Sequence, residues 1–317
     1  MTRENAQPNF HHLPVLLDEC LTGLSINPEG IYIDGTLGGG GHSGEILKQL
    51  TTGRLIGIDR DEDALNAATA RLKGPNFTAL RGNFHDVKAL LSGIGIEKID
   101  GALLDLGVSS FQLDEGRRGF SYHQDAPLDM RMDQSQVLST RGIVNEWSQT
   151  DIARILREYG EESWAVQIAR VITDRREKEP IETTAQLVAI LDAAIPKKVR
   201  SKDSSHPARR TFQALRIAVN DELAPLKQAL FDFVDALNPK GRLCVIAFHS
   251  LEDRIVKNAF RELQNPCTCP KNMPICVCGK RPQIRIVTRK PVTASDAELE
   301  KNPRARSATL RIAEKLG

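Results

Sequence analysis

Short apolar segments alternate with helix-like segments through the first third of the chain. Between residues 30 and 105 each apolar run has the length of a buried strand, and turn-forming residues bound the runs. The runs are Ile31–Ile33, Leu55–Ile58, Ile99–Leu104 and a weaker one at Phe77–Leu80. Strands that are joined by helical crossovers form parallel sheets covered on both faces. The pattern therefore predicts a doubly wound α/β body.

The same pattern returns near the end of the chain. It predicts a helix at Leu251–Leu263 and strands at Leu243–Phe248, Ile284–Thr288 and Ala308–Ile312. A turn is predicted at residues 238–241, where the sequence is Asn-Pro-Lys-Gly. We therefore expect one sheet whose strands are divided between the two ends of the chain.

The interval between Asp105 and Leu243 is too long for a single crossover. Its pattern is helical, with helices predicted at 151–159, 161–176, 184–195, 207–219 and 221–237. We expect an inserted helical domain at residues 120–215. Residues 1–119 and 216–317 together would form the α/β domain.

The composition is that of an ordinary globular protein, since the 317 residues are 40% hydrophobic and 26% charged. The N-terminal region has no basic stretch followed by an apolar one, and no apolar run approaches the roughly 18 residues that a membrane span needs. We therefore expect a cytoplasmic protein without a membrane partner. Its six cysteines should be reduced.

The charge of the whole chain does not indicate a nucleic-acid partner, because the formal net charge is only +2. One segment, residues 197–216, is nevertheless basic and contains a single acid, Asp203. Its cations are Lys197, Lys198, Arg200, Lys202, Arg209, Arg210 and Arg216. Such a segment fits an RNA-binding surface or a plain solvated surface.

A glycine-rich loop follows the first predicted strand. The loop GTLGGGGHSG (35–44) lies at the carboxyl end of that strand, where doubly wound sheets bind their ligands. Gly39, Gly41 and Gly44 match the G-x-G-x-x-G pattern, so an NAD-dependent oxidoreductase is one interpretation. Asp34 favours another, because a carboxylate beside the loop repels a pyrophosphate but suits the amino and sulfonium groups of S-adenosylmethionine.

Acidic and aromatic residues follow the other strands of this half. Asp59 ends the second strand, where a carboxylate can accept hydrogen bonds from both ribose hydroxyls of an adenosine. Phe84 and Asp105 follow the third and fourth strands, which places Phe84 to pack on an adenine and Asp105 to reach the adenine or the reacting group. The alternatives are a core position for Phe84 and turn or capping roles for Asp34 and Asp59.

Several segments together resemble the bacterial 16S ribosomal RNA cytosine-N4 methyltransferases. They are HLPVLLDE (12–19), YIDGTLGGGGHSG (32–44), IGIDRD (56–61), LLDLGVSSFQLD (103–114), RGFSY (118–122), PLDMRMD (127–133), HPARRTFQALRI (206–217), FHSLEDRIVK (248–257) and NPRARSATLRI (302–312). The resemblance implies a Rossmann-like class I methyltransferase fold with an inserted helical substrate-recognition domain. It also implies transfer of a methyl group from S-adenosylmethionine to N4 of a decoding-centre cytidine.

The resemblance further implies particular site residues and a partner. The family's cofactor contacts fall on Gly40, Gly41, His42, Asp59, Phe84, Asp105 and Gln112. Asp34 joins this cofactor-binding set because of its position beside the loop. The implied partner is 16S rRNA within the small ribosomal subunit, and we expect no role for DNA.

Methylation of an exocyclic amine requires the nitrogen to be aligned with the methyl group and to lose a proton. We expect Asp105 to be the catalytic residue that orients this nitrogen or accepts its proton. Asp105 is followed by Leu-Gly-Val rather than by the Pro-Pro-aromatic sequence of many amino-group methyltransferases. The aromatic residue that stacks on the base is therefore expected among Phe111, Phe120 and Tyr122.

Two further polar residues follow the late strand at Leu243–Phe248. His249 and Ser250 are both placed towards the edge of the sheet where ligands bind. A helix is predicted from Leu251, so Ser250 fits the role of its N-cap equally well.

Four cysteines lie in one short segment, at Cys267, Cys269, Cys276 and Cys278. In a reducing compartment such a cluster suggests a metal before a disulfide. Structural zinc sites, however, favour two to four residues between paired ligands, and a Cys-x-Cys pair strains both thiolates onto one ion. We therefore expect no metal and a surface segment whose cysteines have no obligatory role.

Three classes of function follow from these patterns: an RNA methyltransferase, an NAD-dependent oxidoreductase, and a non-catalytic RNA-binding module with a Rossmann-like core. Titration with S-adenosylmethionine and with NAD separates the first two classes. A methyl-transfer assay on RNA separates the first class from the third.

Overall fold

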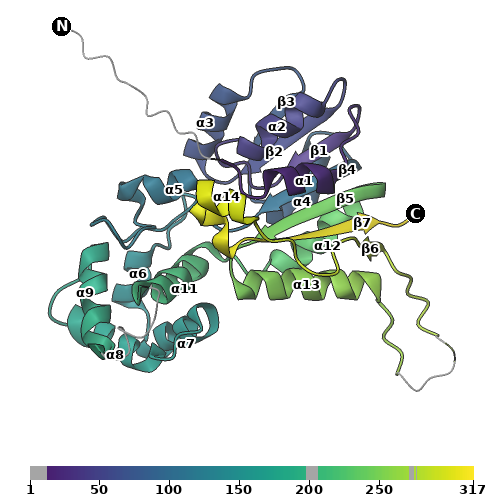
Figure 1. The fold of residues 1–317 in the computed structure, drawn as a ribbon. Helices are drawn as coiled ribbons and strands as arrows, with labels where there is room; N and C mark the ends of the chain where they lie inside the picture. The colour runs from purple at the N-terminus through teal and green to yellow at the C-terminus, as the bar shows by residue number, and fades with distance from the viewer. Residues whose placement is uncertain (1–12, 198–205, 271–274, 276) are drawn as a thin grey trace, which may run out of the picture.

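The computed structural model describes residues 13–197, 206–270, 275 and 277–317. Within them the chain forms a seven-stranded sheet in the order β3-β2-β1-β4-β5-β7-β6 (Figure 1). The strands are β1 (Ile31–Asp34), β2 (Arg54–Asp59), β3 (Phe77–Arg81), β4 (Ile99–Asp105), β5 (Leu237–Ala247), β6 (Ile284–Ile286) and β7 (Thr309–Lys315). Strands β1 to β5 are parallel, and β7 runs antiparallel to β5 and β6. The predicted sheet, divided between the two ends of the chain, is confirmed.

Helices cover both faces of this sheet. One face packs against α4 (Val87–Gly93), α12 (Leu226–Ala236) and α13 (Ser250–Gln264), and the other against α1 (Leu17–Leu24) and α2 (Gly41–Gln49). A further helix, α3 (Glu62–Arg71), packs beside β2 and β3. Neighbouring residues of a strand point to opposite faces, so Tyr32 and Ile33 belong to different hydrophobic clusters. Burial on both faces explains why these strands are continuous apolar runs in the sequence.

One predicted turn is part of a strand. Strand β5 begins at Leu237 and runs through residues 238–241. Its register against β4 shifts between Ile99 and Gly101, and Lys240 has a left-handed φ of 70°. The segment is therefore a bulge, which bends the strand but does not end it.

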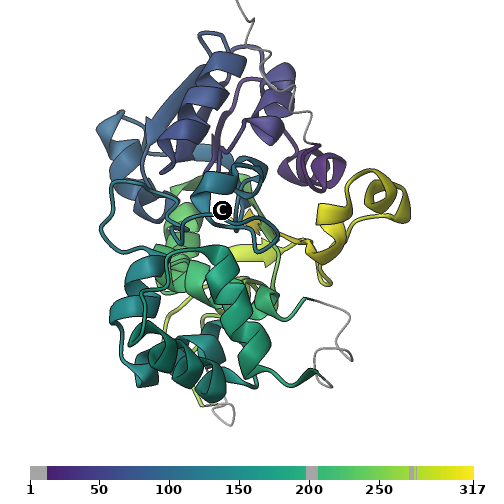
Figure 2. The ribbon, with the colours of Figure 1, turned by 90° about the vertical axis from the view of Figure 1, so that its left-hand side faces the viewer.

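A second hydrophobic core lies outside the sheet. It is formed by α6 (Thr140–Glu146), α7 (Gln149–Gly160), α8 (Ala165–Arg176), α9 (Thr184–Ala194) and α11 (Ala208–Asn220), which lie together below the sheet in Figures 1 and 2. Its buried residues range from Phe120 to Val219. This shared core supports the inserted helical domain. The predicted end at residue 215 falls inside α11, so we propose that the insertion ends at Asn220, the last residue of that helix.

Two helices begin later than predicted. Glu161 and Asp221 have φ values of 48° and 46°, and each follows the last residue of a helix. A residue in the left-handed conformation ends a helix and redirects the chain. For this reason α8 begins at Ala165 rather than at residue 161, and α12 begins at Leu226 rather than at residue 221.

Short elements surround the carboxyl edge of the sheet. They are η1 (Phe84–Asp86), α5 (Ser110–Asp114), η2 (Gly116–Arg118), α14 (Asp296–Lys301) and η3 (Pro303–Ser307). Arg304 of η3 bonds to the carboxylate of Asp114 in α5 at 2.7 Å, so the C-terminal region reaches the same edge as the first half of the chain. In the part of the chain that is described, no helix is long and apolar enough to cross a membrane.

Candidate active site

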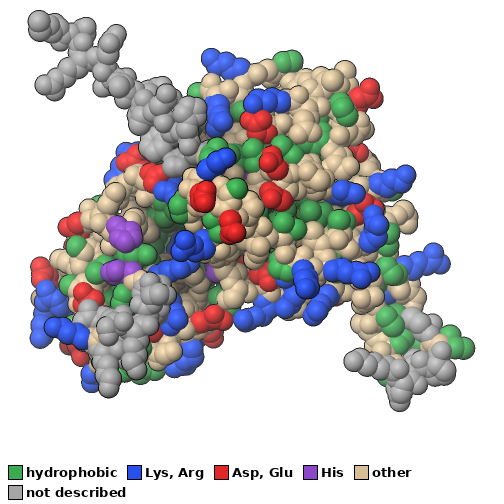
Figure 3. Space-filling model, viewed as in Figure 1, with side chains coloured by type: hydrophobic (Ala, Val, Ile, Leu, Met, Phe, Trp, Pro, Cys, Tyr) green, Lys and Arg blue, Asp and Glu red, His purple; other side chains and the backbone are tan. Residues whose placement is uncertain are grey.

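A cavity of about 1310 Å³ lies at the carboxyl edge of the sheet. The loops after β1, β2, β3 and β4 line one part of it, and α11 lines the other with Phe120, Tyr122 and His123. Element η3 closes a further side, and Figure 3 shows the molecule hollowed at this boundary between the α/β domain and the insertion. Sites for one small ligand usually measure about 300–1,000 Å³. The cavity therefore has room for a cofactor and a second ligand.

The glycine-rich loop turns tightly into α2. Gly38 and Gly40 have φ values of 49° and 72°, which residues with a side chain rarely adopt. A Cβ at Gly41 would lie 2.9 Å from Pro14 Cγ, and one at Gly40 would lie 2.8 Å from Leu72 Cδ1. Gly41 lines the cavity, but Gly40 does not. Gly40 is needed for the turn and for its packing against Leu72, and its contact with the cofactor stays a prediction.

Asp59 lies in the cavity wall at the end of β2. Its Oδ2 accepts a hydrogen bond from the Gly38 amide at 2.8 Å, and its Oδ1 accepts one from the Asp61 amide at 2.9 Å. Burial raises the pKa of Asp59 to about 6, and these two amide bonds oppose that rise. The carboxylate thus holds the glycine-rich loop in place, and each oxygen keeps a lone pair for a ligand hydroxyl.

Asp34 does not line the cavity. Its buried carboxylate accepts hydrogen bonds from the Ser43 hydroxyl at 2.7 Å and from the Thr36 amide at 3.2 Å. Burial raises its pKa, and the bond from Ser43 opposes the rise. Asp34 thus faces α2 and fixes the start of that helix against β1, and its direct contact with the cofactor stays a prediction.

His42 and Asp105 lie side by side in the cavity wall. The Nε2 of His42 lies 2.9 Å from the Val15 carbonyl, which only accepts, so this nitrogen carries the proton. The other ring nitrogen, Nδ1, lies 3.8 Å from Oδ2 of Asp105. The ring is therefore oriented by the backbone of Val15, and its second nitrogen faces the carboxylate.

The carboxylate of Asp105 is only partly bonded. Its Oδ1 is buried and has no hydrogen-bond partner among the described residues. Its backbone amide donates to the Thr36 hydroxyl at 2.6 Å, which fixes the end of β4. Burial raises the pKa of Asp105 to about 6; His42 lowers it, and the carboxylates of Asp34 and Glu252 raise it further. Because the Asp105 side chain lines the cavity and is 27% exposed, its carboxylate is a place where a ligand donor is expected to bind.

Phe84 and Gln112 also line the cavity. Phe84 packs partly against the core of the sheet domain and partly lines the cavity, and its contact with an adenine stays a prediction. The Gln112 amide is already bonded at both ends: Oε1 accepts from the Ser109 amide at 3.1 Å, and Nε2 donates to Asp61 at 2.8 Å. Gln112 therefore ties α5 to the turn after β2, and its second N–H is what a ligand could use.

The three aromatic candidates all line the cavity, with different surroundings. Phe120 is buried in the core of the insertion, and the Arg118 guanidinium lies 5.9 Å from the centre of its ring. Tyr122 stacks on His206 with ring centres 4.8 Å apart. Phe111 lies on α5, beside Gln112, and is only partly buried. Phe111 and Tyr122 thus retain ring surface that a base can contact, whereas Phe120 is mainly a core residue.

A buried charge network beside the site was missed by the sequence analysis. Asp61 caps α3, and its carboxylate accepts hydrogen bonds from Gln112 at 2.8 Å and from Arg118 at 2.9 Å. Arg118 also donates to the backbone carbonyls of Arg131 and Met132. Asp61 before a run of acids signals a helix N-cap, but no local pattern indicates that its partner is a distant arginine.

The residue that caps α13 is His249 rather than Ser250. The Nδ1 of His249 accepts from the Glu252 amide at 3.5 Å, whereas the Ser250 hydroxyl bonds to Glu161 of the insertion at 3.1 Å. The suggested cap role of Ser250 is therefore wrong. His249 lines the cavity with Glu252. Burial favours a raised pKa for Glu252, but its hydrogen bonds with His249 and the charge of Arg216 lower the pKa overall.

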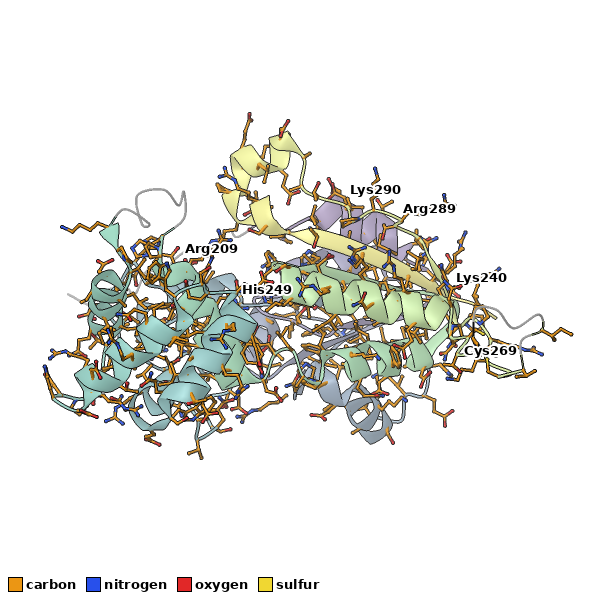
Figure 4. All side chains as sticks on the ribbon, turned by 90° about the horizontal axis from the view of Figure 1, so that it is seen from below. Arg209, Lys240, His249, Cys269, Arg289 and Lys290 are labelled. Carbon is orange, nitrogen blue, oxygen red and sulfur yellow. The ribbon has the colours of Figure 1, made fainter. Side chains whose placement is uncertain are left out.

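The predicted basic segment at 197–216 is only partly described. Lys198, Arg200, Lys202 and Asp203 lie outside the described residues. Arg216 forms an ion pair with Glu222 at 2.9 Å and is largely buried, so it is not a surface cation. Arg209 lines the cavity and donates to the Ser307 hydroxyl at 3.2 Å. Figure 4 shows Arg209 and His249 at the boundary between the insertion and the sheet domain.

These features define a class of protein. A parallel sheet with an antiparallel β7, a glycine-rich loop after β1 and an acid at the end of β2 are the parts of a class I S-adenosylmethionine-dependent methyltransferase. The residues present fit this cofactor, because Gly41, Asp59 and Phe84 lie in one cavity at the edge where such sheets bind nucleosides. The predicted fold class is confirmed.

Comparison with known proteins gives the family. Residues 9–316 match the MraW methylase family. The chain is 56% identical over 310 residues to a ribosomal RNA small subunit methyltransferase H of Symbiobacterium thermophilum, covering 97% of each protein. It is 52% identical over 309 residues to the protein of that name from Finegoldia magna, covering 97% of this chain and 99% of the other. Among solved structures, an rRNA methylase from Streptococcus thermophilus is 11% identical with a TM-score of 0.41, covering 95% and 94% of the two chains.

The chain therefore belongs to the MraW methylase family. The family resemblance seen in the sequence is confirmed, and with it S-adenosylmethionine as the cofactor.

Proposed function

We propose that this protein transfers a methyl group from S-adenosylmethionine to the exocyclic N4 of a decoding-centre cytidine in 16S rRNA of the small ribosomal subunit. The names of its relatives support small-subunit rRNA as the substrate. The observation that carries the choice of an amino nitrogen is the carboxylate of Asp105, whose side chain lines the cavity and is 27% exposed. A carboxylate oxygen accepts an N–H, and the exocyclic amine of cytosine is an N–H donor.

The first part of the cavity suits the cofactor. Asp59 would accept hydrogen bonds from the ribose hydroxyls, Phe84 would contact the adenine, and the backbone near Gly41 would allow the ligand to approach closely. The bound cofactor supplies an electrophilic methyl group on a positively charged sulfur. The carboxylate of Asp105 lies in the wall of the same cavity and favours that positive charge.

Asp105 has two tasks in this proposal. Its carboxylate accepts a hydrogen bond from N4 of the base, which holds the nitrogen in line for transfer. Because the pKa of Asp105 is raised to about 6, the group is largely ionised at neutral pH yet basic enough to take the proton that the nitrogen loses. His42 is held by the Val15 carbonyl and keeps Nδ1 towards this carboxylate.

The second part of the cavity suits the acceptor base. A base inside folded RNA must leave its stack to reach a cavity, and an aromatic ring in the cavity replaces part of that stacking. Tyr122, stacked on His206, and Phe111 present such rings on opposite sides of the domain boundary. Arg209 lies near them in the wall and would contact a phosphate of the acceptor strand.

A basic surface on the sheet domain offers a path for the rest of the RNA. Lys257, Arg261 and Arg289 line a small hollow of about 60 Å³ together with Arg311. Arg311 pairs with Asp253 at 2.6 Å, but among the described residues no acid forms an ion pair with the other three cations. Figure 3 shows Lys and Arg side chains gathered over α13 on this face. We place the RNA backbone here, and the reaction in the cytoplasm, because the small subunit is the proposed acceptor.

The test is methyl transfer to defined acceptors together with analysis of cellular rRNA. Purified protein with labelled S-adenosylmethionine should methylate small-subunit RNA or subunits taken from cells that lack the enzyme, and not those from cells that contain it. Mass spectrometry should locate the new methyl group on N4 of a single cytidine. Methylation at another base or at a ring nitrogen would refute the acceptor assignment, and binding of NAD in place of S-adenosylmethionine would refute the enzyme class.

A further inference from the structure

A cluster of thiols lies in the segment between α13 and β6, far from the cavity. The Sγ atoms of Cys267, Cys269 and Cys278 all lie within 4.8 Å of one another. Cys267 and Cys278 are eleven residues apart, and their Sγ atoms are 3.8 Å apart. Cys276, the fourth cysteine of this segment, lies outside the described residues. The chain therefore gathers thiols from both ends of the segment at one point.

This spacing is that of a tetrahedral thiolate site. Zinc–thiolate bonds are about 2.3 Å long, so two sulfurs of a zinc tetrahedron are about 3.8 Å apart. The distance between Cys267 Sγ and Cys278 Sγ has this value. We propose that Cys267, Cys269 and Cys278 bind one Zn²⁺ ion as thiolates, each releasing its proton to solvent on binding.

The geometry also answers the objection raised by the sequence. The expectation of no metal rests on the strain of a Cys-x-Cys pair that chelates one ion by itself. In the structure the Sγ atoms of Cys267 and Cys278 are 3.8 Å apart and that of Cys269 lies within 4.8 Å of both, so ligands from the two ends of the segment share the ion. With Cys278 as a third ligand, Cys267 and Cys269 do not have to hold the ion by themselves. This revises the sequence-based expectation.

The cysteine-containing segment between α13 and β6 has few packing contacts that could stabilise it. In its described part, no hydrophobic side chain between Leu263 and Ile284 belongs to the buried core. Ile275 and Val277 are instead 74% and 71% exposed. Figure 1 shows the described parts of this segment projecting from the sheet domain at the end of α13. Small units that lack a core commonly depend on a metal or a disulfide for their structure. The zinc site would supply that link.

The other two cysteines of the chain are different. Cys20 and Cys244 are buried in the core of the sheet domain, and burial raises the pKa of Cys20 well above its usual value and that of Cys244 to about 12. They are therefore protonated core residues and not metal ligands. Metal binding is thus specific to the exposed segment.

The metal would have a structural role. Helix α13 has fifteen residues, so its two ends are about 22 Å apart. Figure 4 shows Cys269 beyond the end of α13 that is opposite to His249. The ion is therefore too far from Asp105 to take part in methyl transfer. Its effect would be to fix the shape of the projecting segment, next to Lys280 and Arg281.

The experiment measures metal in the full-length protein purified under reducing conditions. We expect about one equivalent of zinc in the wild-type protein by elemental analysis, and less than a tenth of that in Cys267→Ser and Cys278→Ser. Thr268→Ala is the matched control, because Thr268 lies exposed between two proposed ligands, and this variant should keep the metal. Substitution with Co²⁺ should give thiolate-to-metal charge-transfer absorption that both serine variants lack.

A second measurement uses only the wild-type protein, so it tests the proposal even where a serine variant does not fold. Chelation of the wild-type protein should remove the zinc and make residues 265–283 at least tenfold more sensitive to protease, while the sheet domain stays resistant. Added Zn²⁺ should restore protection. Wild-type protein that neither contains nor takes up zinc would overturn the proposal, as would a mass two hydrogens lower that shows a disulfide between these cysteines. Methyl transfer is measured separately, so a negative result here leaves the proposed function unaffected.

Discussion

The guanidinium of Arg118 lies 2.9 Å from the carboxylate of Asp61, and both side chains are 2% exposed. Arg118 leads into the insertion, whereas Asp61 caps α3 directly after the cofactor-binding edge of the sheet. The Asp61 amide donates to Asp59, and Arg118 donates to the carbonyls of Arg131 and Met132. One buried ion pair therefore connects the proposed ribose-binding acid with the backbone of the inserted helical domain.

Loss of Arg118 should destabilise the protein strongly. Arg118→Met leaves the Asp61 carboxylate buried without its partner, which typically costs about 3–5 kcal/mol. The double variant Arg118→Met with Asp61→Asn removes both charges and should recover part of this loss. Denaturant unfolding measures both effects. Arg141→Met, which breaks an exposed ion pair with Glu182, is the control and should leave the midpoint of denaturant unfolding unchanged. Equal losses of unfolding free energy in the Arg118 and Arg141 variants would contradict the stabilising role of the buried pair.

Asp59→Ala should weaken binding of S-adenosylmethionine by about tenfold or more. The change removes the acceptor for the ribose hydroxyls and the bond that holds the Gly38 amide at 2.8 Å. Asp59→Asn keeps one side-chain oxygen, so its affinity for S-adenosylmethionine should lie between those of the wild-type protein and Asp59→Ala. Calorimetric titration provides the affinities, and Asp86→Ala, an exposed acid at the same edge, is the matched control. Wild-type affinity in Asp59→Ala would remove Asp59 from the site.

Asp105→Asn should slow single-turnover methyl transfer by roughly 100-fold or more, with a much smaller effect on cofactor affinity. The wild-type rate at saturating cofactor and RNA should rise with pH and level off above about 6, because the ionised form acts and the pKa of Asp105 is raised to about 6. The asparagine variant should lack this rise. Equal losses in rate and affinity would make Asp105 a binding residue only.

The same substitution should stabilise the protein without ligands at neutral pH. Burial raises the pKa of Asp105 from 3.8 to about 6, so the folded state binds this proton more tightly than the unfolded state. The resulting stability is fully present below about pH 3.8 and is lost as the pH rises through about 6. Asp105→Asn should therefore gain on the order of 1–3 kcal/mol at pH 7.5 and much less at pH 4.5. Thermal unfolding at the two pH values checks this, and a gain that does not depend on pH would contradict it.

Removing the cations of the small hollow beside α13 that are unpaired among the described residues should change how RNA binding depends on salt. Replacing Lys257, Arg261 and Arg289 by Gln should reduce the slope of log affinity against log salt by about two units, at about 0.7 per phosphate contact for single-stranded RNA. Affinity for S-adenosylmethionine should not change. The control replaces Lys48, Arg54 and Lys73, three exposed cations on other parts of the surface. Equal slopes for the two triple variants would place the RNA elsewhere.

The architecture of the sheet domain could be predicted from local patterns in the amino-acid sequence. Buried parallel strands leave apolar runs that are visible locally, and the carboxyl ends of such strands meet at one edge. Asp59 and Asp105 could therefore be assigned to one site simply from where their strands end. The family resemblance added His42 and Gln112, which periodicity alone could not distinguish from structural residues.

The direction in which individual side chains face depends on how the elements pack in three dimensions. Asp34 and Gly40 adjoin the same loop as Gly41, but neither lines the cavity. Asp34 bonds to Ser43 instead, and Gly40 packs against Leu72. Arg216 has the sequence context of a surface cation, but Glu222 pairs with it in the interior. The cysteine spacing argues against a metal, but folding brings Cys267 next to Cys278. In each case the partner is supplied by packing of another element, and local periodicity carries no information about the direction of such a contact.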